Sequence, residues 1–480
     1  MTSSGPAYSP ERIPFYRDSR ILAIIAQVIF VIVVVAFTAF LYTNMSTRLA
    51  AASGGTSAVP FNFNFLKQTA GFAIAEGPAF SPEESYGRAF VIGILNTLRV
   101  AVIGIVLATI LGIVTGIARL SNNWLLRNIA GAYVELIRST PLLVQLFFLY
   151  FAVILKLPDL SNRITLPGVG ILSNRGIAFS WFYVTESGRP WLYWLLAGVV
   201  VGGIAVYLRR RFLAAQDRVG MTSPYGVAAF LVVAIVGLIV TGMTASLPSN
   251  MAYELRMGDR GTLFVDNNGN GEFDRGIDDP IRYVPVNLTL ADGTVLDTVS
   301  TDRSGEFRFY NLEQKGDSLT WNTPGPLYLS QPALQGFNLR GGLEFSPEFA
   351  GLLLGLVLYT AAFIAEIVRA GINSVSKGQT EAARALGLKT GETLRMIVLP
   401  QALRVIIPPL TSQFLNLTKN SSLAIAIGYP DLFQVSLTVL NQSGAEVQMF
   451  ILIMATYLTL SLLTSGFMNV YNSRVALVER

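Results

Sequence analysis

The feature that most constrains this chain is a series of apolar runs long enough to cross a membrane. A bilayer core of roughly 30 Å needs about 20 apolar residues as an α-helix, and about eight stretches of the 480-residue chain reach that length. They cover residues 21–42, 89–117, 129–155, 191–208, 227–247, 346–368, 405–429 and 447–468. The sequence therefore predicts an all-α transmembrane architecture with about eight spans.

Arginines around these runs predict the orientation. Short loops rich in Lys and Arg stay in the cytoplasm, and the first run is too long for a signal-peptide core, so we expect it to remain as an anchor. Alternation from a cytoplasmic N-terminal segment places every arginine-rich loop on the same side; these arginines are Arg12, Arg17, Arg20, Arg119, Arg127, Arg209, Arg210, Arg211 and Arg218. Both termini are therefore expected in the cytoplasm.

Composition narrows the kinds of site that the chain can hold. It is 52% hydrophobic and 14% charged, which is too apolar for a soluble protein of this size. It has no Cys and no His, which excludes disulfides and thiolate or imidazole metal sites, so a bound metal would need oxygen ligands. The net charge of +5 comes from basic residues scattered around the apolar runs. We therefore expect no nucleic-acid partner.

A polar segment over 249–345 interrupts the series of spans. It contains short alternating stretches such as residues 285–290, which are typical of strands and not of helices, and alternation places it outside. The predicted order is a cytoplasmic segment 1–20, an anchor 21–42, spans over 89–155, two additional spans over 191–247, the extracytoplasmic insertion 249–345, and further spans over 346–480.

The most specific motif lies in the loop after the sixth run, at about 376–400. Its members are Glu381, Ala382, Ala383, Gly387, Ile397, Leu399 and Pro400. Thr380 and Thr390 are expected to cap two short helices, small side chains allow close approach of a partner, and Glu381 offers a charge. One alternative is a basic amphipathic stretch lying on the membrane surface.

This spacing resembles the complete EAA pattern of bacterial ABC import permeases. The resemblance implies that the loop binds a separate ATPase subunit, present as a dimer, and transmits its closure to the membrane spans. The chain itself has no Gly-x-x-x-x-Gly-Lys-Ser/Thr phosphate loop. It is therefore expected to be a transporter subunit and not an enzyme, with ATP used only through the partner.

Three further stretches, 133–145, 365–371 and 417–428, resemble permeases for polar amino acids. The resemblance implies the type I ABC importer permease fold in the bacterial plasma (inner) membrane. The additional first helix and the long insertion are similar to the larger permease of general L-amino acid systems. That likeness implies a second permease as heterodimer partner, an extracytoplasmic solute-binding protein, and an L-amino acid substrate.

Charged and polar residues inside the spans are costly and are therefore usually paired or functional. Two pairs share a helix face at a separation of three residues, Glu135 with Arg138 and Glu366 with Arg369. The favoured interpretation is two structural ion pairs near the cytoplasmic helix ends; the alternative is a contribution to the substrate path.

Substrate contact is predicted instead at a polar break in the seventh run, formed by Lys419, Asn420, Ser421 and Ser422. The alternative there is a helix hinge with locally bonded hydroxyls.

Pro408 and Pro409 are expected to break the same run. In the second run Arg99 is expected to extend toward the aqueous surface, and in the third run Thr140 and Pro141 predict a kink.

The insertion contains a candidate calcium loop with oxygen side chains at EF-hand spacing and glycine at the sixth position. The candidate ligands are Asp266, Asn268, Asn270, Glu272 and Asp274. Position twelve is Ile277, so Asp278 or Asp279 must serve after a shift of one residue. With the strand-like sequence around it, the region over about 262–321 resembles the calcium-binding B-type β-sandwich repeats of surface adhesins. The alternative is an Asx-rich turn without metal.

Two other classes of protein fit the sequence less well than an ABC permease. A secondary amino-acid transporter would share the polar groups at mid-membrane but would not need the loop. A membrane-anchored adhesin would explain the β insertion but not seven further spans. An ABC permease for another small polar solute differs only in substrate, and the sequence leaves it open.

Overall fold

The computed structural model describes residues 19–52, 63–216, 222–244, 249–256, 260–274, 277–290, 292–302, 304–309, 318–321, 325–335 and 338–475. Most of the predicted cytoplasmic segment 1–20, with Arg12 and Arg17, lies outside the described residues, and so does Arg218.

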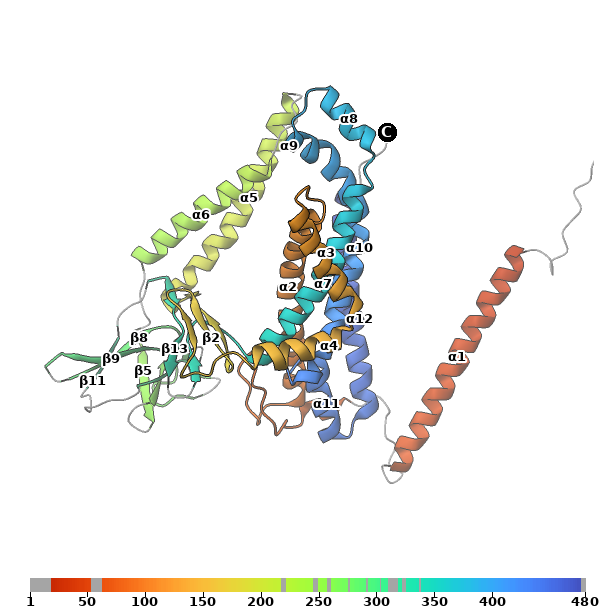
Figure 1. Ribbon diagram of the computed structural model, residues 1–480. Coiled ribbons are helices and arrows are strands. Elements are labelled where there is room, and N and C mark those ends of the chain that lie inside the picture. The colour runs from red at the N-terminus through yellow and green to blue at the C-terminus, as the bar shows by residue number, and fades with distance from the viewer. Residues whose placement is uncertain are drawn as a thin grey trace, which may run out of the picture.

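Long helices form most of the described chain, as the apolar runs predict (Figure 1). Six of them are long and apolar enough to cross a membrane, or seven if a bent pair counts as one span. The long helices are α1 (Ser19–Ala52), α2 (Tyr86–Ala118), α3 (Trp124–Ser139), α5 (Arg189–Ala215), α6 (Ser223–Met243), α7 (Pro347–Asn373), α10 (Leu399–Asn420) and α12 (Glu446–Val475). Within α1 the apolar stretch is Gln27–Phe37, which is shorter than the apolar helices of the other spans.

The predicted span over 129–155 is not continuous. Helix α3 ends at Ser139, and the chain resumes as α4 (Leu142–Phe147) and the π-helical η2 (Phe148–Ile154), with a bend of 110°. Pro141 has no N–H and does not continue α3. The amide of Gln145 donates to the carbonyl oxygens of Ile137 at 2.7 Å and Thr140 at 2.9 Å, which satisfies carbonyls at the bend. The predicted kink is therefore a sharp break.

Helix α7 lies at the centre of the bundle and contacts α2, α3, α4 and α10. Its start is as predicted, because the Ser346 hydroxyl accepts the Phe349 N–H at 3.1 Å and Pro347 occupies the first turn. Helix α2 packs closely against α7 through two small residues. A Cβ added at Gly112 would lie 2.6 Å from the Ile364 side chain, and one at Gly116 would lie 2.8 Å from the Ala365 carbonyl oxygen.

The seventh run differs from the prediction at its prolines. Helix α10 continues through Pro408 and Pro409 without interruption, because their neighbours Ile407 and Leu410 pack into the core. The helix changes only at Ser421, where it tightens into the 3₁₀ segment η5 (Ser421–Ile427). Tertiary packing therefore outweighs the local effect of the two prolines.

Short elements close the end of the bundle opposite α8 (Lys377–Ala385) (Figure 1). They are the 3₁₀ turn η1 (Asn64–Lys67) with the irregular chain that follows it, and α11 (Leu432–Ser443), which the sequence did not predict. The Asp431 side chain caps α11 by accepting the Gln434 N–H at 2.9 Å. We call these two ends the α8 end and the α11 end.

The insertion folds as two sheets around one core, as expected for a sandwich-like domain. One sheet contains β5 (Met251–Arg256), β6 (Arg260–Val265), β7 (Asp279–Pro280) and β10 (Glu306–Arg308); the other contains β8 (Pro285–Thr289), β9 (Val295–Ser300) and β11 (Ser318–Trp321). The core side chains alternate along the strands and include Leu263, Val286 and Phe307.

The β-rich region of the protein also includes four strands that precede the predicted insertion 249–345 in the sequence. These are β1 (Ile164–Leu166), β2 (Gly170–Ser173), β3 (Gly176–Phe179) and β4 (Trp181–Val184). They pair with strands from the far side of the insertion: β3 with β15 (Leu343–Phe345), and β4 with β12 (Leu327–Ser330). A two-stranded pair, β13 (Ala333–Gln335) with β14 (Asn338–Arg340), completes this part. Two segments that are separate in the sequence, 164–184 and 327–345, therefore form the sheets next to the inserted domain. Helices α5 and α6 lie between these segments in the chain.

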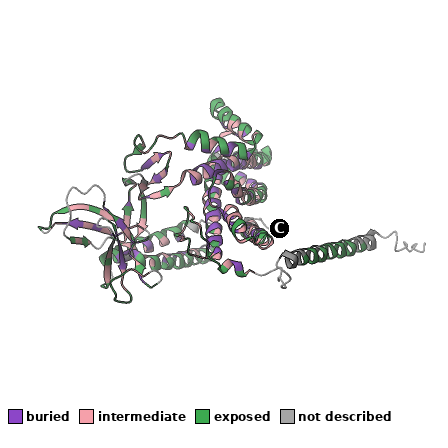
Figure 2. Cartoon of the chain, turned by 90° about the horizontal axis from the view of Figure 1, so that it is seen from below, coloured by how far each residue is buried: buried purple, intermediate pink, exposed green. Residues whose placement is uncertain are grey.

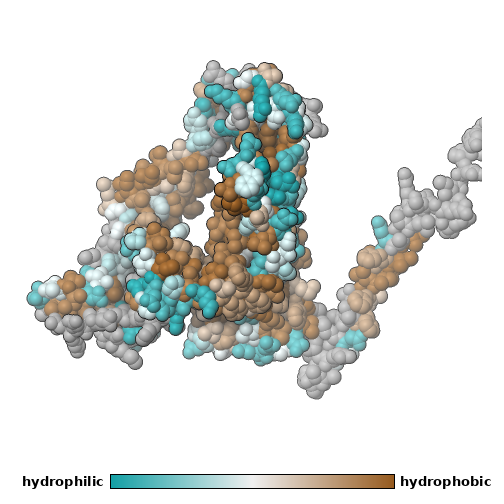
Figure 3. Space-filling view, in the orientation of Figure 1, coloured by the Kyte–Doolittle hydropathy of each residue, from teal (hydrophilic) through white to brown (hydrophobic). Residues whose placement is uncertain are grey.

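Exposed apolar side chains distinguish the outer faces of the helices from their buried contacts (Figures 2 and 3). Phe30 on α1, Leu196 on α5 and Phe467 on α12 are 69%, 66% and 72% exposed. Faces of this kind along helices of membrane-spanning length match the hydrocarbon interior of a bilayer.

Candidate transport and coupling sites

Helix α8 presents the EAA residues at one extremity of the bundle (Figure 1). Its N-cap is Ser376, not Thr380 as predicted. Thr380 lies inside the helix, where its hydroxyl donates to the Lys377 carbonyl oxygen at 2.7 Å. Glu381 and Ala382 are exposed, whereas Ala383 is buried against the chain itself.

The end of α8 explains the glycine of the motif. Gly387 has a φ of +83°, a left-handed conformation that side chains with a Cβ rarely adopt. Its N–H donates to Arg384 O at 2.9 Å, and the Leu388 N–H donates to Ala383 O at 3.1 Å. These two bonds form a Schellman motif. Gly387 is therefore needed to end α8, and open space surrounds the position where a Cβ would lie.

The second half of the loop leads directly into the membrane. Helix α9 (Thr390–Thr393) begins at Thr390, and Glu392 accepts the Lys389 N–H at 2.9 Å in the manner of a capping box. A π-helical turn, η4 (Leu394–Val398), then joins α9 to α10, which starts at Leu399 and Pro400. Ile397 lies within this π-turn, half-buried.

Exposed apolar side chains cluster on this loop. Leu386 is 82% exposed, and Leu394 and Met396 are 50% and 54% exposed. The chain around them is polar, as Figure 3 shows for the α8 end. Exposed apolar side chains grouped on a polar surface make this loop a candidate contact site for another protein.

Four charged side chains meet near the α8 end. Glu366 on α7 forms an ion pair with Arg119 at the end of α2, and it accepts the Arg369 Nε–H at 3.3 Å. Arg138 on α3 lies 4.0 Å from Glu366, with its guanidinium 5.3 Å from the centroid of the Phe363 ring. The predicted pair of Glu366 with Arg369 is therefore present, and Arg119 joins it.

The predicted pair of Glu135 with Arg138 is not formed. Glu135 is exposed and makes no ion pair with any described residue, because Arg138 turns toward Glu366 instead. Three guanidinium groups thus surround one carboxylate, which leaves this cluster with an excess of positive charge.

The polar stretch at the end of α10 bonds mostly to itself. The Ser421 hydroxyl donates to Thr418 O at 2.7 Å, and the Ser422 hydroxyl donates to Lys419 O at 2.8 Å. Asn420 is half-buried and Lys419 is exposed. The Lys419 ammonium and the Asn420 side-chain amide make no hydrogen bond or ion pair with any described residue.

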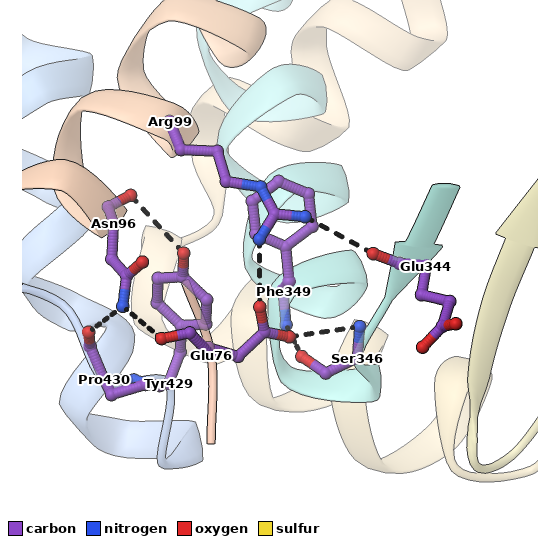
Figure 4. Close-up of polar contacts among 8 residues, drawn as sticks. All are labelled: Glu76, Asn96, Arg99, Glu344, Ser346, Phe349, Tyr429 and Pro430. Atoms are coloured by element: carbon purple, nitrogen blue, oxygen red, sulfur yellow. Dashed lines mark hydrogen bonds and ion pairs between the residues drawn. The ribbon is translucent and has the colours of Figure 1, made fainter. Parts of the chain in front are cut away.

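A second polar cluster lies at the α11 end, and sequence reasoning missed it (Figure 4). Arg99 does not extend to the aqueous surface as expected, but forms an ion pair with Glu76 at 2.9 Å. The other carboxylate oxygen of Glu76 accepts the Ser346 N–H at 3.3 Å. An unpaired arginine in an apolar run is costly, so the sequence could have indicated that Arg99 has an acidic partner. Nothing in the sequence of residues 63–85 identified Glu76 as that partner.

Asn96 ties this cluster to two other segments. Its amide donates to Glu76 O at 3.1 Å and to Pro430 O at 2.8 Å, and the Tyr429 hydroxyl donates to Asn96 O at 3.4 Å (Figure 4). Four stretches that are distant in the sequence therefore meet at Arg99 and Asn96.

The candidate calcium loop brings most of its predicted side chains together. Asn268 and Asn270 both donate to Asp274 Oδ2 at 2.8 Å, and the Asp266 carboxylate accepts the N–H groups of Gly269 and Gly271. Asp278 is 5% exposed and accepts the N–H groups of Asn267 and Asp274, while Glu272 is exposed. Within the described residues, no three acidic side chains are close enough to form a metal centre by themselves. A calcium site here would depend on asparagine and backbone oxygens as well.

Comparison with known proteins tests these assignments. Residues 342–477 match the family described as "Binding-protein-dependent transport system inner membrane component". The general L-amino acid transport system permease protein AapQ of Rhizobium johnstonii is 38% identical over 465 residues, covering 96% of this chain and 94% of the relative. This chain belongs to the amino-acid ABC transporter permeases.

Two further relatives extend over nearly the whole length. The permease protein YhdX of Escherichia coli (strain K12) is 36% identical over 467 residues, covering 97% of each chain. The glutamate/glutamine/aspartate/asparagine transport system permease protein BztB of Rhodobacter capsulatus is 34% identical over 469 residues, covering 96% of each. The predicted B-type insertion is also confirmed, because residues 256–337 match the SdrD B-like domain.

Membership of this family settles several predictions. The permease is a multi-pass inner-membrane transport component and not an enzyme. ATP is used through a partner ATPase, and the family works with ATPase and solute-binding partners in general.

Proposed function

We propose that this permease, paired with a second permease, forms the path by which L-amino acids of several side-chain types cross the inner membrane. The observation that carries the proposal is near-full-length similarity to a permease named for general L-amino acid transport. The test is uptake of labelled L-glutamine, L-leucine and L-arginine by proteoliposomes that contain the permease pair, the ATPase and a solute-binding protein. Uptake without ATP would contradict the proposal and favour a secondary transporter.

The ATPase binds at α8 and α9. Support comes from the exposed side chains of Leu386 and Met396, from the exposed Glu381, and from the short connection between this loop and both α7 and α10. This role places the α8 end in the cytoplasm, with both chain termini, and the β insertion on the opposite side. Labelling of single cysteines checks the orientation without background, because the chain has no Cys. A membrane-impermeant thiol reagent should label Leu386→Cys only from the cytoplasmic side.

Assembly with a second permease remains a separate part of the proposal. Its support is that two relatives are named as permease proteins of transport systems, which contain more than one protein. Co-expression with each neighbouring permease gene, followed by mass measurement of the intact complex, distinguishes a heterodimer from a homodimer.

Lys419 contacts the solute, and the cluster around Glu366 stabilises the α8 end. Lys419 is exposed and its neighbours Ser421 and Ser422 are bonded to backbone carbonyl oxygens, whereas the charges of Glu366 are paired. The variant Lys419→Ala should reduce uptake while assembly is unchanged. Arg88→Ala is the matched control, because Arg88 is also charged, exposed and on a bundle helix. Equal uptake by Lys419→Ala and the parent protein would remove Lys419 from the path.

The inserted domain binds calcium. Support comes from the convergence of Asn268 and Asn270 on Asp274, from the Asp266 carboxylate that accepts two N–H groups of the same loop, and from Asp278, which accepts the Asp274 N–H. A bound calcium ion would hold this loop in one conformation. Addition of calcium should raise the melting temperature of the domain within the full-length protein, and Asp274→Ala should remove that gain. No calcium-dependent change in melting would favour a metal-free Asx turn.

A further inference from the structure

The carboxylate of Glu76 occupies a position that is built to bind a carboxylate. One oxygen lies 2.9 Å from Arg99 Nη1, and the other accepts the Ser346 N–H at 3.3 Å (Figure 4). A guanidinium and the N-terminus of a long helix both attract negative charge. Helix α7, which starts directly after Ser346, has 27 residues.

Arg99 is held in place independently of Glu76. Its guanidinium lies 4.3 Å from the centroid of the Phe349 ring and 5.7 Å from that of Phe345, and Nη2 donates to Glu344 O at 3.3 Å. Two aromatic faces and a carbonyl therefore fix the guanidinium. Removal of Glu76 would leave a positioned donor pair directed at an empty carboxylate site.

Glu76, in contrast, lies in a stretch without regular secondary structure, between Phe72 and Phe80, whose rings pack together and anchor the stretch on either side of it. It lies in the irregular stretch between η1 and α2, where Thr69 and Ser85 form an isolated bridge. Its main attachments besides the carboxylate contacts are one bond from Asn96 and the close fit of Gly77 on the Asn96 side chain. The ion pair is also partly accessible, because the side chains of Arg99 and Glu76 are 27% and 14% exposed.

We propose that Arg99 and the N-terminus of α7 bind the α-carboxylate of an amino acid that comes from the α11 end. Glu76, displaced from Arg99, then pairs with the α-ammonium of the same amino acid. This inference rests on the proposed function and adds a site to it. In the structure the Glu76 carboxylate takes the place of the substrate carboxylate.

The charges favour zwitterions over other solutes. One positive and one negative side chain can accept an amino acid with every charge paired, whereas a simple amine or acid leaves one protein charge unpaired in a poorly hydrated site. The contacts involve only the groups that all α-amino acids share. A site of this type therefore transports amino acids with different side chains, as a general system requires.

The first test compares three amino acids in the reconstituted ATP-driven complex. Arg99→Gln and Glu76→Gln should each lower the uptake of L-glutamine, L-leucine and L-arginine by the same factor, at least about tenfold, because a charge-assisted contact is lost. Arg88→Gln is the matched control, since Arg88 pairs with Glu84 at the same end but both side chains are well exposed. Unequal losses among the three amino acids, or no loss, would overturn the proposal.

The second test separates binding from a purely structural ion pair. The double variant Glu76→Arg/Arg99→Glu keeps one positive and one negative side chain but exchanges their positions. The negative charge then lies on α2, and the positive charge lies in the irregular stretch. A structural pair would regain uptake in the double variant, whereas the proposal requires uptake to stay at the level of the single variants. Melting temperature and co-purification with the ATPase monitor folding. Where Arg99→Gln is unstable, Arg99→Lys keeps the charge without the guanidinium fork and should give a partial, uniform loss.

Uptake by the parent protein distinguishes failure of the proposed function from failure of the carboxylate site. If it shows no ATP-dependent uptake of any of the three amino acids, the proposed function is wrong. If it transports them and the Arg99 and Glu76 variants transport equally well, only the carboxylate site is wrong.

Discussion

Truncation of Leu386 should weaken the binding of the ATPase without affecting the fold of the permease. Complete burial of a leucine side chain is worth about 1.5–3 kcal/mol. Leu386 is 82% exposed, so nearly all of its apolar surface is available to a partner. Because Leu386→Ala retains the Cβ, the loss is about 1–2 kcal/mol, or roughly 5- to 30-fold in dissociation constant. Leu386 makes few contacts within the chain, so the melting temperature should be unchanged.

The assay is titration of labelled ATPase onto the permease in nanodiscs, followed by measurement of substrate-stimulated ATP hydrolysis. Leu196→Ala is the matched control, because Leu196 is 66% exposed but lies on α5 and not on the coupling loop. The control should bind the ATPase like the parent protein. An unchanged dissociation constant for Leu386→Ala would refute docking through this surface. A fall in melting temperature would instead show that Leu386 stabilises the permease itself.

Three further predictions concern other parts of the chain. Gly387→Ala should cost about 1–2 kcal/mol at the end of α8, because its φ is +83°, and ATPase stimulation should fall while Gly391→Ala has no such effect. Glu366→Gln should lower the melting temperature by leaving clustered guanidinium groups without their carboxylate; recovery in the double variant with Arg119→Gln checks that cause. Chelation of calcium should lower the melting temperature of the inserted domain by an amount that Asp278→Asn abolishes, and equal melting of parent and variant in both conditions would contradict calcium binding.

Local features of the sequence were sufficient for the elements that depend on local physics. The start of α7 followed from a hydroxyl and a proline at Ser346 and Pro347, and the long spans followed from the length of their apolar runs. The two short helices expected in the EAA loop are present as α8 and α9, although Thr380 proved to lie inside α8. A cap depends on which residue begins the helix, and helix boundaries shift easily by a turn.

Side-chain and strand pairings between segments that are distant in the sequence could not be predicted from local sequence features. The partner of Arg99 is a glutamate in an irregular segment, and only the tertiary structure brings Glu76 beside it. Likewise β3 and β4 are short, and their partners β15 and β12 lie near the far end of the insertion, after α5 and α6. The same applies to Arg138, whose neighbour in sequence, Glu135, was a less favourable partner than Glu366 on another helix.

The two charged clusters share one rigid element, α7, which would connect the proposed ATPase site with the proposed solute site. Glu366 lies twenty residues after Ser346, so α7 separates the clusters by about 30 Å at 1.5 Å per residue. Only Ser374 to Ser376 connect α7 to α8, and Ser374 is bonded back onto α7 by its N–H and its hydroxyl. A displacement of α8 by the ATPase is therefore transmitted to α7 and not absorbed in a flexible loop. Because the Ser346 N–H is part of the Glu76 site, movement of α7 along its axis changes that site directly. We therefore expect Glu76→Ala to raise ATP hydrolysis in the absence of substrate, since it removes the carboxylate oxygen that accepts the Ser346 N–H at the start of α7.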